Sequence, residues 1–316
     1  MATVQLTFRE GTARDLADTF AVAERALHEV AVRQGVMADG VELTEAAIRS
    51  HWLRQRSIVE FLAAQPNSRY WIAEAGDKIV GFARVVRFGH MEELTELMVD
   101  PDYQRQGIAR ALLEHCWPGD PTPDLGRVVV ATGAPADLTL YPDVGVMPVT
   151  GHWHVRVSTE LYVERRAHEV DAREPDTVVL SPERAVEEWG RLEAQAIAHE
   201  RPALHAFFAR DRKCLATLSQ DGHATGLCWV SPQGELGPAV GEEPECLVPV
   251  VLAALDRVAK TQEPEELSLF CTTIAWWLLR RLRGLGFYVY WPSWIMCSVP
   301  LPGLDRYVPT RPPHLL

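Results

Sequence analysis

The sequence predicts a two-domain protein of mixed α/β (α+β) class, in which each domain has a mixed central sheet flanked by helices. Three observations support this prediction. The chain has 316 residues, which is long for one domain and suits two domains of about 150 residues each. In the first half, segments with the two-residue alternation of strands are interspersed with segments of helical spacing. Landmarks of the first half then recur at nearly constant separations in the second half.

Composition narrows the class of protein. A hydrophobic content of 47% with 23% charged residues is typical of a folded globular chain. The net charge of −12 argues against a nucleic-acid partner. No apolar run approaches the roughly 20 residues of a membrane span, and the N-terminal residues lack the pattern of an export signal. We therefore expect a cytoplasmic protein with no membrane partner. The sequence says nothing about its oligomeric state.

The six cysteines are scattered and include no CxxC pair. An even number permits disulfides, but free thiols are the expectation for a cytoplasmic chain.

The first elements follow from local patterns. Val4–Glu10 alternates as a strand does. Thr12 can cap a helix whose apolar positions continue to Leu27, and Thr44 can cap a second helix that ends before Pro66. The segments predicted after these two helices are, in order, a hairpin over 69–88 with its turn at Gly76-Asp77, a strand over 92–99, a helix over 106–116, a strand over 127–132, a short helical piece that carries Tyr141, and the last strands over 145–163.

The junction after Val99 is the most informative stretch of the sequence. There a strand passes through the loop Gln104–Ala109 directly into a helix. The first N–H groups of a helix have no partner within it, and the helix dipole is positive at that end, so phosphate binds readily. Gly107 lets the backbone approach a diphosphate closely, Ala109 adds little bulk, and Arg105 can supply positive charge. The alternative is an ordinary strand-to-helix loop that contains a glycine.

In this context, residues 4–163 resemble the GNAT acyltransferase superfamily. The most specific match is Gln104-x-x-Gly107-x-Ala109, which is similar to the family's pyrophosphate loop. The resemblance implies acetyl-CoA or another acyl-CoA as co-substrate, with the pantetheine arm on the strand and the diphosphate on the loop. The residues that it implies for this binding are Leu97, Met98, Val99, Gln104, Arg105, Gln106, Gly107, Ile108, Ala109 and Arg110.

The same resemblance implies a general acid. Tyr141 lies four residues before Gly145, as in the family's Y-x-x-x-G-F segment, whose tyrosine lies near the sulfur atom. A phenol there can protonate the departing thiolate. Val146 replaces the usual phenylalanine, and Ala134 stands where many relatives have asparagine. The alternative is a tyrosine packed with its hydroxyl at a surface rim.

Glu96 is the candidate general base, because many relatives place a glutamate at this point of the strand, acting directly or through water. Glu92 and Glu93 are competitors, and His90 is less favoured. Alternation places Glu92 and Glu96 on one face and Glu93 on the other, unless a bulge intervenes. A solvated strand residue is the alternative interpretation of Glu96.

His152 and His154 point to the same side of a predicted strand. With no third ligand in register they make a poor zinc site, and we expect no metal.

The second half is predicted to be a degenerate copy of the first. The matching landmarks are Gly81 with Gly226, Val99 with Val240, and Gly145 with Gly286. We therefore predict a catalytic domain over 1–163, a charged linker over 164–175, and a GNAT-like domain over 176–316 that ends in a proline-rich tail.

The chemistry of the first half is not copied. Val248 and Val250 align with Gly107 and Ala109, and Leu282 aligns with Tyr141. Three acidic residues in the aligned loop would repel a diphosphate, and Pro249 lacks a donor N–H. The acidic residues are Glu242, Glu243 and Glu245.

A helix is predicted over Thr272–Arg283, with Trp276 and Trp277 in the core or at the domain interface, or in an aromatic acceptor pocket as the alternative. The tail is too proline-rich for regular structure.

The leading interpretation is an N-acetyltransferase that moves an acyl group from acyl-CoA to a primary amine of a small molecule. The alternatives are a non-catalytic acyl-CoA sensor or scaffold, and a protein lysine acetyltransferase. The presence of Tyr141 favours an enzyme, because a sensor needs no proton donor. The acceptor amine is not identified by the sequence, although the negative net charge favours a cationic one.

Overall fold

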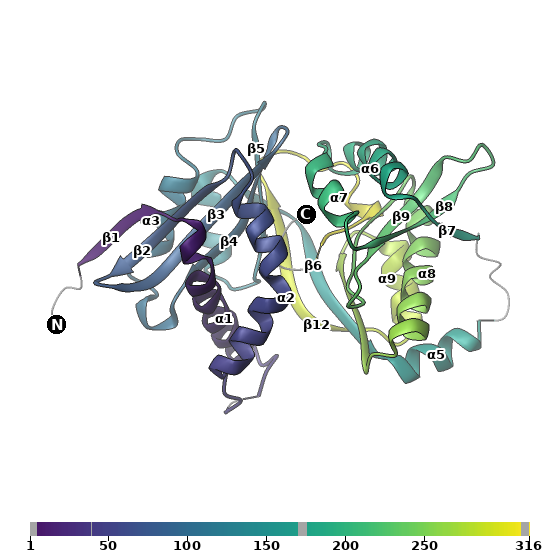
Figure 1. Cartoon of the computed structure of the whole chain (residues 1–316), viewed down its shortest axis with the longest axis horizontal. Helices are drawn as coiled ribbons and strands as arrows, with labels where there is room; N and C mark the ends of the chain where they lie inside the picture. Colours follow the sequence, from purple (N-terminus) through teal and green to yellow (C-terminus); the bar gives the residue numbers. More distant parts are fainter. Residues whose placement is uncertain (1–4, 39, 170–175, 311–315) are drawn as a thin grey trace. The chain divides into compact units, whose positions relative to one another are not determined.

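The computed structural model describes residues 5–38, 40–169, 176–310 and 316 (Figure 1). Internal packing divides the chain into two compact units, Met1–Val129 with Ala134–Met147, and Val130–Gly133 with Pro148–Leu316. Both units combine helices with sheet, and the mixed α/β prediction is confirmed. Within the described ranges, no helix is long and apolar enough to cross a membrane.

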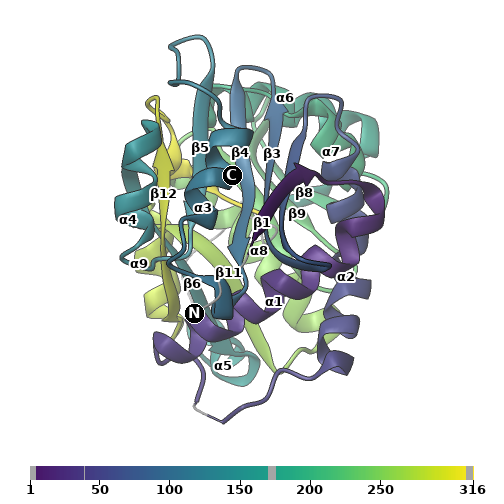
Figure 2. The same cartoon turned by 90° about the vertical axis from the view of Figure 1, so that its left-hand side faces the viewer.

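The first unit is built on five neighbouring strands in the order β1-β2-β3-β4-β5 (Figure 2). The strands β1 to β4 pair antiparallel, and β5 runs parallel to β4. Their bounds are β1 (Leu6–Glu10), β2 (Arg69–Ala75), β3 (Lys78–Phe88), β4 (Met91–Val99) and β5 (Gly126–Ala131).

The helices of this unit begin where the sequence predicts caps. Thr12 and Asp15 form a capping box at the start of the first helical turn, and the Thr44 hydroxyl accepts a hydrogen bond from the Ala47 N–H at 3.2 Å. The helical segments are η1 (Ala13–Asp15), α1 (Leu16–Arg33), α2 (Glu45–Ala63), η2 (Pro101–Tyr103), α3 (Ile108–Cys116), α4 (Asp137–Leu140) and η3 (Pro142–Val144).

Helices cover both faces of this sheet (Figure 1). On one face, Phe82 and Met98 belong to a core that includes Phe20 of α1. On the other face α3 packs closely, and a Cβ atom at Gly81 would lie 3.1 Å from Ile108 Cγ2. A side chain at position 81 would therefore require α3 side chains to shift, and glycine lets the helix pack closely on the strand.

The second unit contains two groups of paired strands. One is a five-stranded sheet in the order β13-β10-β9-β8-β7, and in the other the neighbours are β12-β6-β11. The strands are β6 (Met147–Ser158), β7 (Thr177–Val179), β8 (Lys213–Leu218), β9 (Ala224–Val230), β10 (Leu236–Gly241), β11 (Glu266–Thr272), β12 (Tyr288–Cys297) and β13 (Tyr307–Val308). The helical segments are α5 (Thr159–Ala167), α6 (Pro182–Ile197), α7 (Pro202–Phe208), α8 (Pro244–Gln262), α9 (Trp276–Gly284) and η4 (Leu304–Arg306).

The pairing of β6 explains why the boundary between the two compact units differs from the predicted domain boundary at residue 163. This strand pairs antiparallel with β11, from His152 opposite Thr272 to Ser158 opposite Glu266. Most of β6 therefore packs with the second half of the chain, although it comes from the first half of the sequence.

The order of elements repeats, as the duplication predicts. The series β1-α1-α2-β2-β3-β4-α3-β5-α4-β6 is followed by β7-α6-α7-β8-β9-β10-α8-β11-α9-β12. One landmark is wrong by a residue. Gly81 pairs with Val99 and Gly226 pairs with Gly241, so the counterpart of Val99 is Gly241 and not Val240.

The predicted loop alignment is also wrong. Helix α8 already begins at Pro244 with Glu243 at its N-cap, so Val248 and Val250 lie inside the helix. The counterpart of Gly107, the N-cap of α3, is therefore Glu243.

Three other local predictions are corrected by the structure. The residues Thr159–Ala167 form helix α5 and not a strand or linker, because the Ser158 hydroxyl caps the helix and accepts from the Leu161 N–H at 3.3 Å. Residues 170–175 of the predicted linker lie outside the described residues. Helix α9 begins at Trp276, four residues later than predicted, because Thr272 still belongs to β11.

Two aromatic side chains are more exposed than predicted. Trp276 and Trp277 occupy the first turn of α9 and are 65% and 54% exposed. They are therefore not core residues. The proline-rich tail also differs from the prediction, because it contains the short helix η4 and strand β13. All six cysteines are free thiols.

Candidate functional site

Strand β4 has an open edge over its second half. Its parallel pairing with β5 runs from Met91 opposite Gly126 to Leu94 opposite Val129. The strand then continues through Val99, and over Thr95–Val99 it has no β5 partner in the described chain. Every second residue of a strand turns its peptide groups toward that edge. The open edge coincides with Leu97, Met98 and Val99, the residues predicted to bind pantetheine.

The loop after β4 exposes a left-handed backbone. Arg105 and Gly107 have φ values of 62° and 82°, on either side of Gln106, and all three residues are exposed. A Cβ atom at Gly107 would meet nothing within 4 Å. Turns of this kind direct successive N–H groups into one concavity, which suits an anion. The open space above Gly107 leaves room for a diphosphate.

Helix α3 starts without a side-chain cap. Gly107 is its N-cap, no side chain hydrogen-bonds there, and the first N–H directed back along the helix is that of Ala111, 3.1 Å from the Gly107 carbonyl. By helix geometry, the N–H groups of Ile108, Ala109 and Arg110 have no partner inside the helix. These groups and the positive end of the dipole favour an anionic ligand.

A buried carboxylate that the sequence did not single out holds the loop in shape. Asp100 is 3% exposed and accepts from the Asp102 N–H at 3.2 Å. It also lies 3.1 Å from Lys78 Nζ and 3.5 Å from Arg25 Nε. The only sequence signal was its position before a proline at the end of a strand. The Gln104 side chain donates to the Val99 carbonyl at 3.2 Å, which shapes the loop from the other side.

The segment around Tyr141 lies against the first turn of α3. Arg110 of the helix forms an ion pair with Asp143 at 2.6 Å, and Gly145 has a φ of 78° and packs against Pro121. Tyr141 itself is 5% exposed, so its ring is packed within the protein. Burial, with Asp137 nearby, holds the pKa of the phenol well above its ordinary value. The phenol is therefore protonated at neutral pH.

A bulge in β4 changes which glutamates share a face. Arg84 pairs with Glu96 while Val85 pairs with Leu94, so Thr95 is the extra residue. The bulge is the exception that the alternation argument allowed for, and it places Glu93 on the face of Glu96. Glu92 lies on the opposite face.

Glu96 is held by a buried ion pair. Its carboxylate is 2.5 Å from an Arg84 nitrogen, and the two residues are 7% and 0% exposed. Burial raises the pKa of Glu96 above its ordinary value, and the Arg84 guanidinium opposes this rise. Sequence reasoning missed Arg84, although an arginine between the apolar residues Ala83 and Val85 was a signal that it needs a buried partner.

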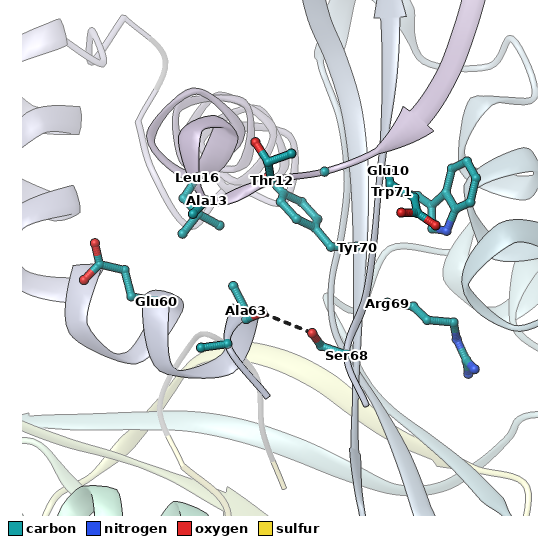
Figure 3. Close-up of a pocket in the computed structure, with 12 residues that line it drawn as sticks. Glu10, Thr12, Ala13, Leu16, Glu60, Ala63, Ser68, Arg69, Tyr70 and Trp71 are labelled. Carbon is teal, nitrogen blue, oxygen red and sulfur yellow. Dashed lines mark hydrogen bonds between the residues drawn. The ribbon is translucent and has the colours of Figure 1, made fainter. Parts of the chain in front are cut away.

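Arg84 connects Glu96 to the wall of a cavity. Its guanidinium lies 4.7 Å from the centroid of the Tyr70 ring, and the Tyr70 hydroxyl is 2.7 Å from the Thr19 hydroxyl. Tyr70 lines a cavity of about 480 Å³ between η1, the end of α2 and the start of β2 (Figure 3). The dashed bond from Ser68 to the Ala63 carbonyl, at 3.1 Å, closes one side of it.

This cavity lies at the end of the sheet away from the loop. Trp71 in its lining pairs with Glu10, whereas Val99 pairs with Gly81 near the other end of the strands. The cavity is therefore not the predicted diphosphate site.

Two of the other candidate bases differ from Glu96 in their surroundings. Glu92 forms ion pairs with Arg69 and, at 3.8 Å, with Arg127. His90 is exposed in the turn before β4. Glu93 is buried on the same face as Glu96, but it lies where β4 is still paired with β5, whereas Glu96 lies in the open part of the edge.

The two histidines of β6 pack among aromatic side chains. His152 and His154 stack on Phe270 with ring centroids 4.8 and 4.5 Å apart, and His152 Nδ1 is 2.9 Å from the Ser293 hydroxyl. Across the described ranges, no group of three or more potential metal ligands occurs.

Comparison with known proteins shows what the part of the chain around β4 and α3 is similar to. Residues 66–136 match the family model of the GNAT acetyltransferase domain. This part of the chain is therefore similar to a GNAT acetyltransferase domain. The matched range includes β4, the phosphate loop and α3, whereas Tyr141 lies beyond its end. No functionally curated protein matches the sequence significantly.

Solved structures share the GNAT architecture over nearly the whole chain. A candidate acetyltransferase from Pyrococcus horikoshii has a TM-score of 0.66 at 15% identity, covering 97% of this chain and 94% of that protein. A tandem GNAT protein of the clavulanic acid biosynthesis pathway has a TM-score of 0.59 at 18% identity, covering 94% and 99%. At these identities the similarity shows the fold alone, and the chain has two GNAT-like sheets.

The second GNAT-like sheet lacks the candidate catalytic groups. Cys228 pairs with Ala239 as Ala83 pairs with Leu97, so the residue at the position of Glu96 is Pro238. Leu282, aligned with Tyr141, is fully buried within α9. The counterpart of Glu96 could not be found by sequence alignment alone, because it depends on the pairing register.

Proposed function

We propose that the GNAT domain transfers an acyl group from acyl-CoA to a primary amine of a small molecule. The observation that supports this most strongly is the continuity of the open edge of β4 with the uncapped start of α3. A strand edge can hydrogen-bond the amide groups of a pantetheine arm, and the helix start can bind the diphosphate that follows. The two features follow each other in the order in which these groups occur in CoA.

Each predicted binding residue has a role in this proposal. The backbone of Leu97, Met98 and Val99 binds pantetheine. The exposed backbone of the loop and of the first turn of α3 binds the diphosphate, through Arg105, Gln106, Gly107, Ile108, Ala109 and Arg110. Gln104 maintains the loop by its bond to the Val99 carbonyl. Arg105 and Arg110 add positive charge.

Glu96 is proposed as the base and Tyr141 as the acid. The amine must lose a proton as it attacks the thioester carbonyl, and a carboxylate whose pKa is raised accepts a proton more readily than an ordinary one. When the carbon–sulfur bond breaks, the Tyr141 hydroxyl donates its proton to the sulfur. Arg84 opposes the rise in the pKa of Glu96 and holds its carboxylate in place.

The direct test is a thiol-release assay with acetyl-CoA and a panel of amines that includes polyamines, amino acids, aminoglycosides and a lysine peptide. Release of one thiol per acetylated small amine would support the proposal. Acetylation of the lysine peptide alone would indicate a protein acetyltransferase. Tight CoA binding without transfer to any acceptor would indicate a sensor, and the proposal would be wrong.

Substituting the base should change the pH dependence. Glu96→Gln is expected to lower kcat by roughly tenfold to a hundredfold, with the largest loss at low pH, where most of the amine is protonated. In the wild type, activity should fall as the pH drops through the raised pKa of Glu96, because the base is then protonated.

The control for this prediction addresses folding. Glu96→Gln leaves the buried Arg84 charge without its partner, which is destabilising. The double variant Arg84→Met/Glu96→Gln removes both charges and should show the same kinetic loss with a higher Tm than the single variant. A Glu96→Gln profile with unchanged height and an unchanged acidic limb would exclude Glu96 as the base.

A further inference from the structure

The C-terminal tail pairs with the second sheet at a position that corresponds to the open edge of β4. In β13, Tyr307 lies opposite Val240 and Val308 lies opposite Ala239 of β10. By strand register, Ala239 and Val240 are the counterparts of Leu97 and Met98, two of the residues predicted to bind pantetheine. An edge that is open in the first GNAT domain is therefore paired with the chain itself in the second.

The residue before this strand reaches the start of α8. The Arg306 guanidinium donates to the Glu242 carbonyl and lies 3.8 Å from the Glu243 carboxylate. Glu243 is the N-cap of α8 and so stands where Gly107 stands in the first domain. The charges are the opposite of those proposed for the first domain. There the loop would bind an anionic diphosphate, whereas here the acidic turn Glu242–Glu243 binds the cationic Arg306.

Tyr307 anchors the tail in a fully buried polar network. Its hydroxyl lies 3.2 Å from Glu193 Oε1 and accepts from Arg201 at 2.5 Å. Glu193 and Arg201 form an ion pair at 2.7 Å, and His205 Nε2 is 2.9 Å from the same carboxylate. All four side chains have no exposed surface. Without the tail, the buried Arg201 guanidinium would lose the hydroxyl of Tyr307 as a hydrogen-bond acceptor.

Further contacts fix the segment on both sides of Tyr307. The Gly303 N–H donates to the Ala196 carbonyl at 2.7 Å, and the Thr272 hydroxyl donates to the Leu304 carbonyl at 2.5 Å. Leu304 and Val308 are buried, and Val308 belongs to the core formed with α8. The tail is therefore packed as an integral part of this domain.

We propose that the second GNAT-like domain retains the former acyl-CoA edge of β10 as a peptide-binding strand edge, and that its permanent ligand is the chain's own segment Leu304–Thr310. The segment supplies a strand to β10 where pantetheine would lie and a cation to α8 where the diphosphate would lie. It protects an otherwise unpaired strand edge from association with other chains. The edge of β10 is therefore closed to CoA. This part of the proposal does not depend on what the first domain catalyses.

Hydrogen–deuterium exchange of the full-length wild type, measured by mass spectrometry with and without CoA, tests whether the edge of β10 is closed to CoA. CoA is expected to slow exchange over residues 97–110 and to leave residues 239–246 unchanged, with one CoA bound per chain by calorimetry. Protection of residues 239–246 by CoA, or two CoA sites per chain, would overturn the proposal.

Substitution in the tail tests the anchoring. Tyr307→Phe should speed exchange in residues 236–241 and 304–310 by at least about tenfold, because a buried hydrogen bond is lost. Residues 91–99 should be unaffected. The matched control is Tyr288→Phe, an exposed tyrosine of the same unit, which should change neither segment. If Tyr307→Phe does not fold, exchange in the same residues is measured in Arg306→Ala, which changes a half-buried side chain. Unchanged exchange in a folded Tyr307 or Arg306 variant would overturn the proposal.

Discussion

Gly107→Glu is expected to weaken CoA binding by roughly tenfold to a thousandfold, because it places a carboxylate against the bound diphosphate. Two unit charges about 4 Å apart interact by about 1 kcal/mol in bulk water and about 4 kcal/mol near a protein surface, and a tenfold to thousandfold loss corresponds to about 1.4 to 4 kcal/mol. The added side chain also occupies the open space above the loop. Folding should be largely preserved, because Gly107 is exposed and no atom lies within 4 Å of the new Cβ position.

The left-handed backbone at Gly107 requires a matched control. Any L-residue at a φ of 82° is strained, so part of the effect of glutamate could come from the backbone. Gly107→Asn separates the two causes, because asparagine tolerates this conformation and carries no charge. Calorimetry should show a much smaller loss for asparagine than for glutamate. If a folded Gly107→Glu protein bound CoA as tightly as the wild type, the loop would not be the diphosphate site.

Tyr141→Phe is expected to lower kcat by roughly a hundredfold while KM for acyl-CoA changes little. The substitution removes one hydroxyl from a buried ring and little volume. If the hydroxyl protonates the departing thiolate, its contribution is made chiefly in the transition state, and the loss appears in turnover. Because the pKa of Tyr141 lies well above its ordinary value, the phenol stays protonated through neutral and mildly alkaline pH. Tyr141 should therefore produce no alkaline limb in that range.

A second tyrosine serves as the control for this measurement. Tyr162 is buried in the other unit, where its hydroxyl donates to Asp256 at 2.6 Å. Tyr162→Phe removes a hydroxyl of the same kind and should lower stability while leaving kcat unchanged. Equal activity of Tyr141→Phe and the wild type would exclude Tyr141 from proton transfer.

The parts of the fold that could be predicted are those set by neighbours in the sequence. Thr12 and Thr44 cap helices because a cap depends on the next three residues, and Gly76 turns a hairpin for the same reason. The phosphate-loop pattern around Gly107 likewise depends on one strand, one turn and one helix start. The geometry of this loop depends on a short segment of the chain, so the residue types in that segment were enough to predict it.

The pairing of distant strands was not predictable from such patterns. The bulge at Thr95 reverses the faces of the neighbouring glutamates, and it becomes visible only through the register with β3. The ion pair of Glu96 joins two strands whose polar residues could each have faced solvent. Alternation within one strand contains no information about an extra residue opposite its partner.

The sequence alone predicted two related domains and, in the first, a loop suited to a diphosphate, and the repeated order of elements agrees with the duplication. Only the tertiary structure decided that β6 pairs with β11, that Asp100 and Arg84 support the site, and that the tail occupies the edge of β10. Composition and spacing describe what each segment can form by itself. Which edge or buried charge a segment meets depends on contacts between residues far apart in the chain, and these contacts exist only once the chain has folded.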